Sequence, residues 1–330
     1  MDLGRPHIAI LDVGHGNCAV LRDSRGAVVI DVGPGGTLLD YLQDQGITSI
    51  DLVLVSHADA DHIGGLIALI ASKEVSVGEV RLNSDAMKGS KLWQDLTYEL
   101  SRLDDRGELS FQVSLTRSAG KPIVRGDIRI EVLAPSKWLA ARGPGAEIEG
   151  QGRVTSNTIS AVIRVLHRSA PVALLTGDMD ALSLKLMGDD DIDMSAPVLV
   201  FPHHGGSTGG ADPAEFTAKL LGKVSPNVVL FSLGRVGRGK VKPQPEIVSA
   251  IKKDWSHVRL ACTQLSQQCR DSAPAVPPSH LLPIVAKGRE RRFCCAGTVV
   301  IALDATAAVY PDLATHGAFI AAEAPSGLCK

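Results

Sequence analysis

The sequence predicts an α/β fold of four layers, αββα, in which two mixed β-sheets pack face to face and helices cover both outer faces. Short apolar runs come in two sets along the chain, and stretches with helical spacing lie between them. Glycine and proline turns separate these segments. With 330 residues, of which 45% are hydrophobic, the chain can bury a large core.

The first set of elements fills the first third of the chain and the segment after it. Its expected strands are residues 7–14, 17–23, 27–33, 51–57, 78–82 and 128–136. Its expected helices are residues 36–47, 63–74 and 90–105, where leucines recur at helical spacing. A glycine-rich loop is expected at 141–152.

The second half repeats this pattern. Its expected strands are residues 157–167, 170–180, 196–204, 226–234, 257–264 and 296–304. Its expected helices are residues 181–188, 211–224 and 244–253. Residues 270–290 form a Pro-rich loop, and residues 305–330 are interpreted as a short tail that carries no recognisable chemistry.

The charge and composition exclude some partner classes. The 34 basic and 36 acidic residues leave a net charge of -2, so overall charge indicates no nucleic-acid or membrane partner, although a local basic patch could exist. No signal peptide is evident, and the apolar runs are too short to span a bilayer. We therefore expect a soluble, cytoplasmic protein of unknown oligomeric state. Its 6 cysteines are then expected to be thiols or metal ligands rather than disulfides.

Residues 56–66, SHADADHIGGL, carry four potential metal ligands close together. His57, Asp59, Asp61 and His62 offer the imidazole nitrogens and carboxylate oxygens that zinc, iron and manganese bind. They follow an expected strand, so alternate side chains can point the same way, and His62 joins them where a helix begins. Four ligands from one short loop would crowd a single ion. The spacing therefore favours two adjacent metal ions.

Further potential ligands follow two other apolar runs. Asp178 comes after ALLTG, where a carboxylate could bridge two metals, and His203 and His204 come after VLVFP. Each signal is weak alone, because a Gly-Asp pair is usually a turn and a histidine pair after a strand is usually a surface feature. The four-ligand loop is the observation that indicates a metal site.

Several motifs, taken in order, resemble those of metallo-β-lactamase-fold hydrolases. The likeness is stronger to the hydrolase domain of the ComEC/Rec2 competence proteins, here as a stand-alone, soluble chain. The motifs are LDVGHGNCAVL, VVIDVG, SHADADHIGGL, NTISAVIRV, LLTGDMD and VFPHHGGS, with a weaker one at FSLGRVGRGKVKPQP. The resemblance implies a four-layer metallo-β-lactamase sandwich. Residues 1–260 would form the hydrolase domain, and the Cys-containing strands and tail at 261–330 would complete it.

The resemblance also implies two divalent metal ions, zinc or manganese. Carried over position by position, it implies the metal ligands His57, Asp59, Asp61, His62, Asp178, His203 and His204. The first two would hold one ion, and the next two would hold the other with one of the two adjacent histidines. Asp178 would bridge the ions. Asp31 would orient a histidine, unless it is only a turn residue at a strand end.

The chain departs from the family pattern near the metals. Many members have histidine in place of Asp59, and a further metal histidine where this chain has Asn157 and Ser160. Fewer nitrogen ligands favour manganese, or a weakly held second ion, over strict zinc preference.

Three further positions depart from the competence-type motifs. His15 and Asn17 replace the Gln and Asp usual in the opening motif. Lys242 stands where relatives often carry histidine before proline. A lysine there could hold a phosphate oxygen, or it could be an ordinary surface lysine.

The implied activity is metal-dependent hydrolysis, in which two ions activate a bridging hydroxide and Asp61 or Asp178 relays a proton. The competence-type resemblance favours a phosphodiesterase or nuclease acting on DNA or a nucleotide-containing phosphodiester. Basic runs at 235–242 and 287–292 agree with this if they bind phosphates, but both could be solvated loops. The alternative is a hydrolase of a small carboxylic ester, lactone or thioester. The full ligand set argues against a non-catalytic binding module.

Four of the cysteines surround two late strands. Cys262, Cys269, Cys294 and Cys295 could form a structural zinc site, but their spacing fits no common zinc ribbon. Buried free thiols are the favoured interpretation, with zinc or a disulfide as alternatives.

Overall fold

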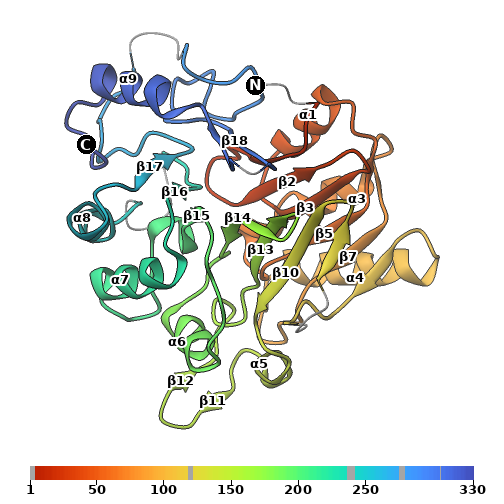
Figure 1. The fold of residues 1–330 in the computed structure, drawn as a ribbon. Helices are drawn as coiled ribbons and strands as arrows, with labels where there is room; N and C mark the ends of the chain where they lie inside the picture. Colours follow the sequence, from red (N-terminus) through yellow and green to blue (C-terminus); the bar gives the residue numbers. More distant parts are fainter. Residues whose placement is uncertain (1–3, 118–121, 236–241, 275–278, 305) are drawn as a thin grey trace.

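The computed structural model of the chain describes residues 4–117, 122–235, 242–274, 279–304 and 306–330. Two large sheets lie face to face, and helices cover the outer face of each (Figure 1). The four layers are therefore helix, sheet, sheet and helix. This confirms the predicted α/β fold.

The first sheet has eight strands in the order β19-β18-β1-β2-β3-β5-β7-β8. They are β1 (His7–Ile10), β2 (Cys18–Arg22), β3 (Ala27–Val32), β5 (Leu52–Leu54), β7 (Glu79–Arg81), β8 (Ser110–Gln112), β18 (Val299–Ala302) and β19 (Val309–Tyr310). Strands from β19 to β3 pair antiparallel, whereas β3, β5, β7 and β8 run parallel. Residues after 261 thus supply one edge of the first sheet.

The second sheet has seven strands in the order β17-β16-β15-β14-β13-β10-β9. They are β9 (Ile123–Arg125), β10 (Ile128–Ala134), β13 (Val162–His167), β14 (Ala170–Leu175), β15 (Val198–Val200), β16 (Val228–Phe231) and β17 (Arg259–Cys262). β9 to β14 form an antiparallel meander, and β14 to β17 run parallel. Two short strand pairs lie outside both sheets, β4 (Ser49–Ile50) with β6 (Ser76–Val77) and β11 (Glu147–Ile148) with β12 (Gly152–Arg153).

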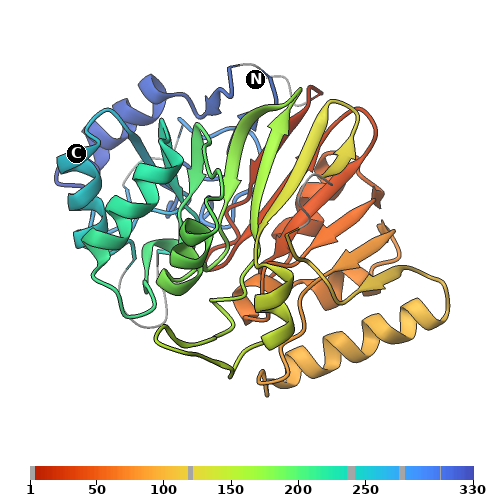
Figure 2. The ribbon, with the colours of Figure 1, turned by 60° about the horizontal axis from the view of Figure 1, so that its bottom comes forward.

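The helices flank the sheets in two groups, as Figure 2 shows with α4 on one side and α7 and α8 on the other. They are α1 (Thr37–Asp44), α2 (Ala60–Ile63), α3 (Leu66–Ala71), α4 (Lys91–Asp105), α5 (Lys137–Arg142), α6 (Ala181–Asp189), α7 (Pro213–Val224), α8 (Pro245–Asp254) and α9 (Leu313–Glu323), with a short 3₁₀ turn η1 (Pro202–Gly205).

Two segments contain elements that the sequence did not indicate. The segment at 141–152, expected as a plain loop, contains the end of α5 and a hairpin whose turn uses Gly150 at φ 66°. The short tail at 305–330 contains β19 and α9. Asp312 caps α9 by accepting the backbone N–H of Thr315 at 2.9 Å, and Ile320 packs into a small apolar cluster.

Three apolar clusters separate the four layers, and strand alternation assigns side chains to them. In β1, Ile8 and Ile10 face the cluster between the two sheets, whereas Ala9 faces the cluster under α1, α3 and α4. A third cluster lies between the second sheet and α6, α7 and α8. Burial of this kind stabilises the fold by about 1.5–3 kcal/mol for each large side chain.

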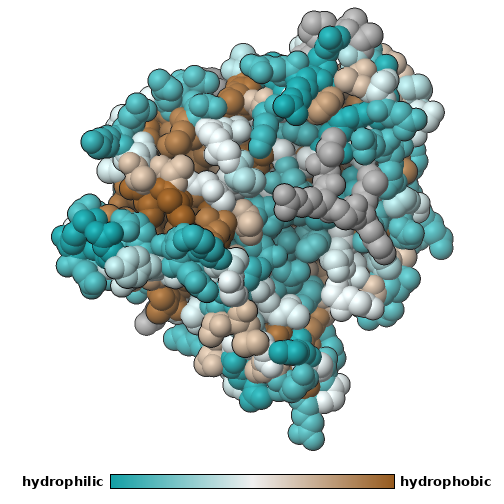
Figure 3. Space-filling view, turned by 180° about the vertical axis from the view of Figure 1, so that it is seen from behind, coloured by the Kyte–Doolittle hydropathy of each residue, from teal (hydrophilic) through white to brown (hydrophobic). Residues whose placement is uncertain are grey.

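The outer surface is mostly hydrophilic on the face opposite that of Figure 1, with apolar side chains gathered toward one side (Figure 3). Within the described ranges, no helix has the length and apolar character needed to cross a bilayer.

Candidate metal centre

The candidate site lies where parallel strands of the two sheets end. Asp31 belongs to β3, His57 follows β5, Asp178 follows β14, and His203 and His204 follow β15. β3 and β5 are parallel neighbours, and so are β14 and β15. Their C-terminal ends therefore meet at one edge of the sandwich, the usual position for a site in parallel sheets.

One group of four potential ligands is fully assembled there. The ligand atoms of Asp61, His62, Asp178 and His204 all lie within 4.8 Å of one another. His62 Nε2 is 3.0 Å from Asp178 Oδ1, and His204 Nε2 is 3.1 Å from Asp61 Oδ2. We call this group the His204 position.

A second group shares Asp178 with the first, and we call it the His57 position. His57 Nε2 lies 3.7 Å from Asp178 Oδ2 and 3.8 Å from Asp59 Oδ2. Asp178 thus turns one oxygen toward each position. His203 stands beside this group, with its Nδ1 2.8 Å from Asp178 Oδ2 and 3.3 Å from the side-chain nitrogen of Asn157.

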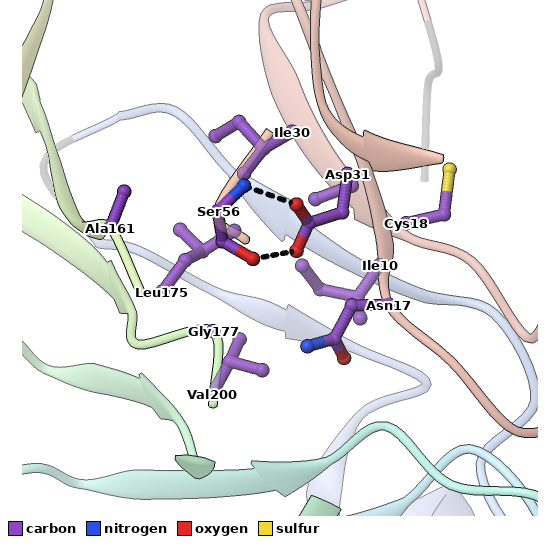
Figure 4. Close-up of a pocket in the computed structure, with 11 residues that line it drawn as sticks. Ile10, Asn17, Cys18, Ile30, Asp31, Ser56, Ala161, Leu175, Gly177 and Val200 are labelled. Carbon is purple, nitrogen blue, oxygen red and sulfur yellow. Dashed lines mark hydrogen bonds between the residues drawn. The ribbon is translucent and has the colours of Figure 1, made fainter. Parts of the chain in front are cut away.

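Asp31 and Ser56 orient His62. Asp31 accepts the backbone N–H of Ser56 at 2.6 Å and its hydroxyl at 2.8 Å, as Figure 4 shows. Its Oδ2 also accepts Nδ1–H of His62 at 2.7 Å. That bond places a proton on Nδ1, so Nε2, which faces Asp178, is the ring nitrogen left to bind a metal ion. A cavity of about 20 Å³ beside this pair has room for about one water molecule.

Two hydroxyls position the His57 ring and the backbone of Asp178. Ser56 Oγ lies 3.1 Å and Ser160 Oγ 3.4 Å from His57 Nδ1, and Ser160 Oγ accepts the backbone N–H of Asp178 at 3.0 Å. Gly177 precedes Asp178 at φ 52°, and a Cβ there would stand 2.3 Å from Ser160 Oγ. Only glycine satisfies both the left-handed backbone and the contact.

The two adjacent histidines sit on unusual backbone. His203 has φ 51° and His204 φ 58°, a left-handed conformation that costs free energy in residues with a Cβ. The turn places one ring beside Asp178 and the other beside Asp61. His204 Nδ1 donates to the carbonyl of Ser232 at 2.5 Å, which leaves its Nε2 for the site.

Carboxylates dominate the charge of the centre. Burial would raise the pKa of Asp178, but His62 and His204 hold it well below its usual range. Burial would lower the pKa of His62, but Asp178 and Asp31 raise it well above its usual value. Burial would also raise the pKa of Asp59, yet the nearby His57 ring and the ammonium of Lys88 lower it to about 2. Ionised carboxylates gathered in a buried site attract divalent cations.

The unpaired atoms of the centre fit a metal ion. His57 Nε2 is buried without a hydrogen-bond partner, and the buried His62 Nε2 and Asp178 Oδ1 face each other at 3.0 Å without a well-aligned hydrogen bond, which is costly unless something else binds them. The separations of 3.0–3.8 Å around Asp178 are those expected for pairs of ligands each about 2.0–2.2 Å from one ion. The residues present therefore fit divalent metal.

The family model of the metallo-beta-lactamase superfamily matches residues 11–211, more than half of the chain. The chain belongs to this superfamily. It is therefore a metal-dependent hydrolase of the metallo-beta-lactamase fold, and the His/Asp cluster of the His204 position could hold the metal. Comparison with curated proteins finds no match to the chain.

Several solved structures are similar to the chain at low sequence identity. The metallo-beta-lactamase fold protein YhfI from Bacillus subtilis is 14% identical, with TM-score 0.47, covering 78% of this chain and 96% of that one. Tm1679, a metal-dependent hydrolase of the beta-lactamase superfamily, is 16% identical, with TM-score 0.48, covering 78% and 95%. Unliganded yeast PDE1 is 11% identical, with TM-score 0.48, covering 79% and 98%.

This superfamily member brings most of its predicted site residues together. Those within the centre or bonded to it are Asp31, His57, Asp59, Asp61, His62, Asn157, Ser160, Asp178, His203 and His204. Lys242 forms no ion pair within 4 Å in the described structure, although it is half-buried beside the centre. Burial lowers its pKa, which Asp178 and Asp61 partly offset.

Besides Ser56, sequence reasoning missed two residues at the centre. His15 Nε2 lies 3.3 Å from Asp61 Oδ2, and its ring is 4.8 Å from that of His204. Burial and the neighbouring His204 lower the pKa of His15 to about 4. Residue 15 lies in the opening motif, where its histidine indicates only a departure from the family pattern. Lys88 binds Asp59 through Nζ, and no sequence motif marks it.

The basic run at 235–242 is only partly described. The guanidinium of Arg235 is buried and donates to the main-chain carbonyls of residues 265, 270 and 271. It therefore stabilises a loop and is not available to phosphate. Arg238 and Lys240 lie outside the described residues. In the second run, Arg289 donates to the carbonyl of Ile284 at 2.9 Å.

The six cysteines are free thiols in the described structure. Cys295 Sγ lies 3.2 Å from His316 Nε2, in a small cluster with Cys262, Cys269 and Cys329. Cys294 points elsewhere and donates to Asp12 at 3.3 Å. The structure therefore groups Cys329, and not Cys294, with the other three. A zinc site in this region stays a prediction.

Proposed function

We propose that this superfamily member is a phosphodiesterase or nuclease that cleaves DNA or another nucleotide-containing phosphodiester. The observation that carries the proposal is a polar cavity of about 480 Å³ that opens beside the metal centre at Asp59 and Asn157. The polar side chains of its lining include Lys88, Gln151, Arg153, Thr155, Ser156 and Ser207. Among the lining residues, Leu182 is the one apolar side chain.

This lining suits an anionic substrate better than an acyl group. Lys88 and Arg153 bring positive charge to the cavity beside the carboxylates of Asp59 and Asp180, and the hydroxyl of Ser207 can donate to a phosphate oxygen. A lactone or thioester with an apolar acyl chain would gain little from burial against such a surface. The volume is typical of small-molecule pockets, so it would take a nucleotide unit rather than a length of duplex.

The roles of the site residues follow from their placement. We propose that the His204 position and the His57 position each bind one divalent ion, zinc or manganese, with Asp178 shared between them. Such ions supply Lewis-acid catalysis and an activated water. Asp31 fixes His62, and Asp61, which lies between His204 and His15, holds or moves a proton.

In the proposed mechanism, two further side chains face the substrate. The side chain of His203 is 21% exposed and its Nδ1 lies 2.8 Å from Asp178 Oδ2, so its ring stands at the edge of the centre beside the bound substrate. Lys242 is placed to neutralise charge near Asp61 and Asp178. The resemblance of the sequence motifs to those of ComEC/Rec2-type hydrolases supports the same substrate class. The cytoplasmic location stays a prediction.

The test is a comparison of substrates on the metal-loaded protein. A bis(nitrophenyl) phosphate reporter and plasmid DNA are incubated beside lactone and thioester reporters, with Asp61→Ala as the inactive control. We expect turnover of phosphodiesters. Turnover of the carboxyl esters alone would overturn the proposal and favour the alternative substrate class.

A paired substitution tests the cavity itself. Arg153→Gln removes a charge from the lining and is expected to raise KM for the phosphodiester about tenfold, with a smaller change in kcat. Arg168→Gln is the matched control, because Arg168 is exposed and pairs with Asp127 at 3.0 Å on a surface turn. Equal kinetics in the two variants would show that the cavity does not bind the substrate.

A further inference from the structure

The two metal positions differ in whether a lysine binds one of their carboxylates. In the His57 position, Asp59 Oδ2 faces His57, while Asp59 Oδ1 accepts a hydrogen bond from the ammonium of Lys88. In the His204 position, the described ion-pair partners of Asp61 are two histidines, His15 and His204, with no lysine or arginine among them. A fixed cation therefore occupies one oxygen of a ligand in the first group only.

Lys88 is held in place by its own segment and is not a loose surface side chain. It lies between β7 and α4, where the buried Asp85 organises the loop: its carboxylate accepts the hydroxyl of Ser156 and the N–H of Met87, the latter at 3.2 Å. The carbonyl of Asp85 accepts Nε1–H of Trp93 at 3.1 Å. The side chains of Lys88 and Asp59 are only 26% and 31% exposed.

A lysine and a divalent ion compete for the same carboxylate. An ion at the His57 position would either displace the ammonium from Asp59 or sit within a few ångströms of it. Charges of the same sign at that separation repel strongly when water is partly excluded. The ion pair of Lys88 with Asp59 is itself partly exposed, so a metal ion can break it at modest cost. The expected effect is a weaker site, not a closed one.

We propose that Lys88 makes the His57 position the weaker of the two metal positions, so that the chain holds one ion tightly at the His204 position and a second only weakly. The inference rests on the proposed function in that both assume metal at these residues. It goes further by assigning the order in which the two positions bind metal ions and the residue that sets this order. Hydrolysis of any particular substrate is not part of it.

The test is metal binding without catalysis. Chelator-treated protein is titrated with Mn²⁺ by calorimetry, and the bound metal is counted by elemental analysis after dialysis. The wild-type chain is expected to show two classes of site whose affinities differ at least about tenfold. Lys88→Met is expected to tighten the weak class by about 10- to 100-fold and leave the tight class unchanged.

Three further variants make the result specific. Lys88→Arg keeps the charge and is expected to retain the weak class. Asp59→Asn is expected to lose the weak class and keep the tight one. Lys91→Met is the matched control for net charge, because Lys91 lies three residues away, is 85% exposed and pairs with Asp95. It is expected to change neither class.

Defined outcomes overturn the proposal. These are two equally tight ions in the wild-type chain, a single ion both with and without Lys88, or a weak class that Lys88→Met leaves unchanged. An unchanged tight class in Lys88→Met shows that the variant is folded. If the metal pattern holds while phosphodiesters are not cleaved, the proposed substrate is wrong and the role of Lys88 stands. If phosphodiesters are cleaved without this pattern, the reverse is true.

Discussion

Asp31→Asn tests whether a buried carboxylate sets the metal affinity of this centre. Asp31 is 2% exposed and accepts three hydrogen bonds, two from Ser56 and one from Nδ1–H of His62. Asparagine keeps the shape and tolerates the left-handed φ of 59° at this residue. Its amide nitrogen is a donor, however, so it cannot accept the proton of His62 Nδ1 if it is turned toward that ring.

The magnitude follows from what His62 must then do. Without its acceptor the ring tends toward the tautomer with the proton on Nε2, the atom that lies 3.0 Å from Asp178 Oδ1. Binding metal at Nε2 then requires moving that proton, and loss of such an orienting partner costs about 10- to 100-fold in metal affinity. This corresponds to about 1.4–2.7 kcal/mol. Loss of one hydrogen bond to a charged group also lowers the free energy of unfolding by about 1.5–3 kcal/mol.

Calorimetric titration of the chelator-treated variant with Mn²⁺ measures the affinity, and urea unfolding of the metal-free protein measures stability. Asp31→Ala is a less useful variant, because alanine adds left-handed backbone strain to the lost acceptor. A tight-class affinity in Asp31→Asn within about twofold of wild type would refute the reasoning, since an orienting carboxylate is expected to matter by tenfold or more.

Three further changes probe the backbone, the pH response and a buried cation. Gly177→Ala should lower the free energy of unfolding by about 1–3 kcal/mol more than Gly46→Ala does, as measured by urea unfolding. Both glycines have positive φ, but only at Gly177 would the added Cβ stand 2.3 Å from Ser160 Oγ. Equal losses of stability in the two variants would contradict this. Burial, with Arg259 and His280 nearby, lowers the pKa of His316 from 6.5 to about 3, so the unfolded chain takes up a proton in that window before the folded one does. Stability should therefore fall from pH 6.5 toward 3 by up to about 1.4 kcal/mol per pH unit from this group, and His316→Gln should show a shallower slope in unfolding at pH 7, 5 and 4. Arg235→Met should cost roughly 2–5 kcal/mol of stability by leaving buried carbonyls unpaired, while KM stays unchanged; a raised KM in a stable variant would restore the phosphate-binding interpretation.

Much of the layer order and the gathering of site residues could be predicted because both depend on local patterns. The alternation of apolar side chains in β1 and their helical spacing in α4 can be read from residues that are close in sequence. Once Asp31, His57 and Asp178 are placed at the ends of parallel strands, the fold itself brings them to one edge.

The remaining features depend on contacts that no local pattern encodes. The separate orientations of His203 and His204 come from left-handed backbone in residues that have a Cβ, which their identities do not signal. The pairing of Lys88 with Asp59 depends on how the loop before α4 is tied through Asp85. Helix α9 is rich in small residues and packs few large side chains, so its spacing gives little indication of a buried face.

The partner of β1 has a consequence for how the chain is made. β1 pairs on one side with β18, where Ile8 lies opposite Ile301, so during synthesis β1 waits for a strand that is made about 290 residues later. At about 5–20 residues per second, that delay is roughly 15–60 s. During it, β1 is an uncovered sheet edge whose isoleucines have no complete core to enter, the condition under which strands pair with other chains. Synthesis of this protein is therefore expected to depend on something that shields β1 and its neighbouring strands until β18 has been made.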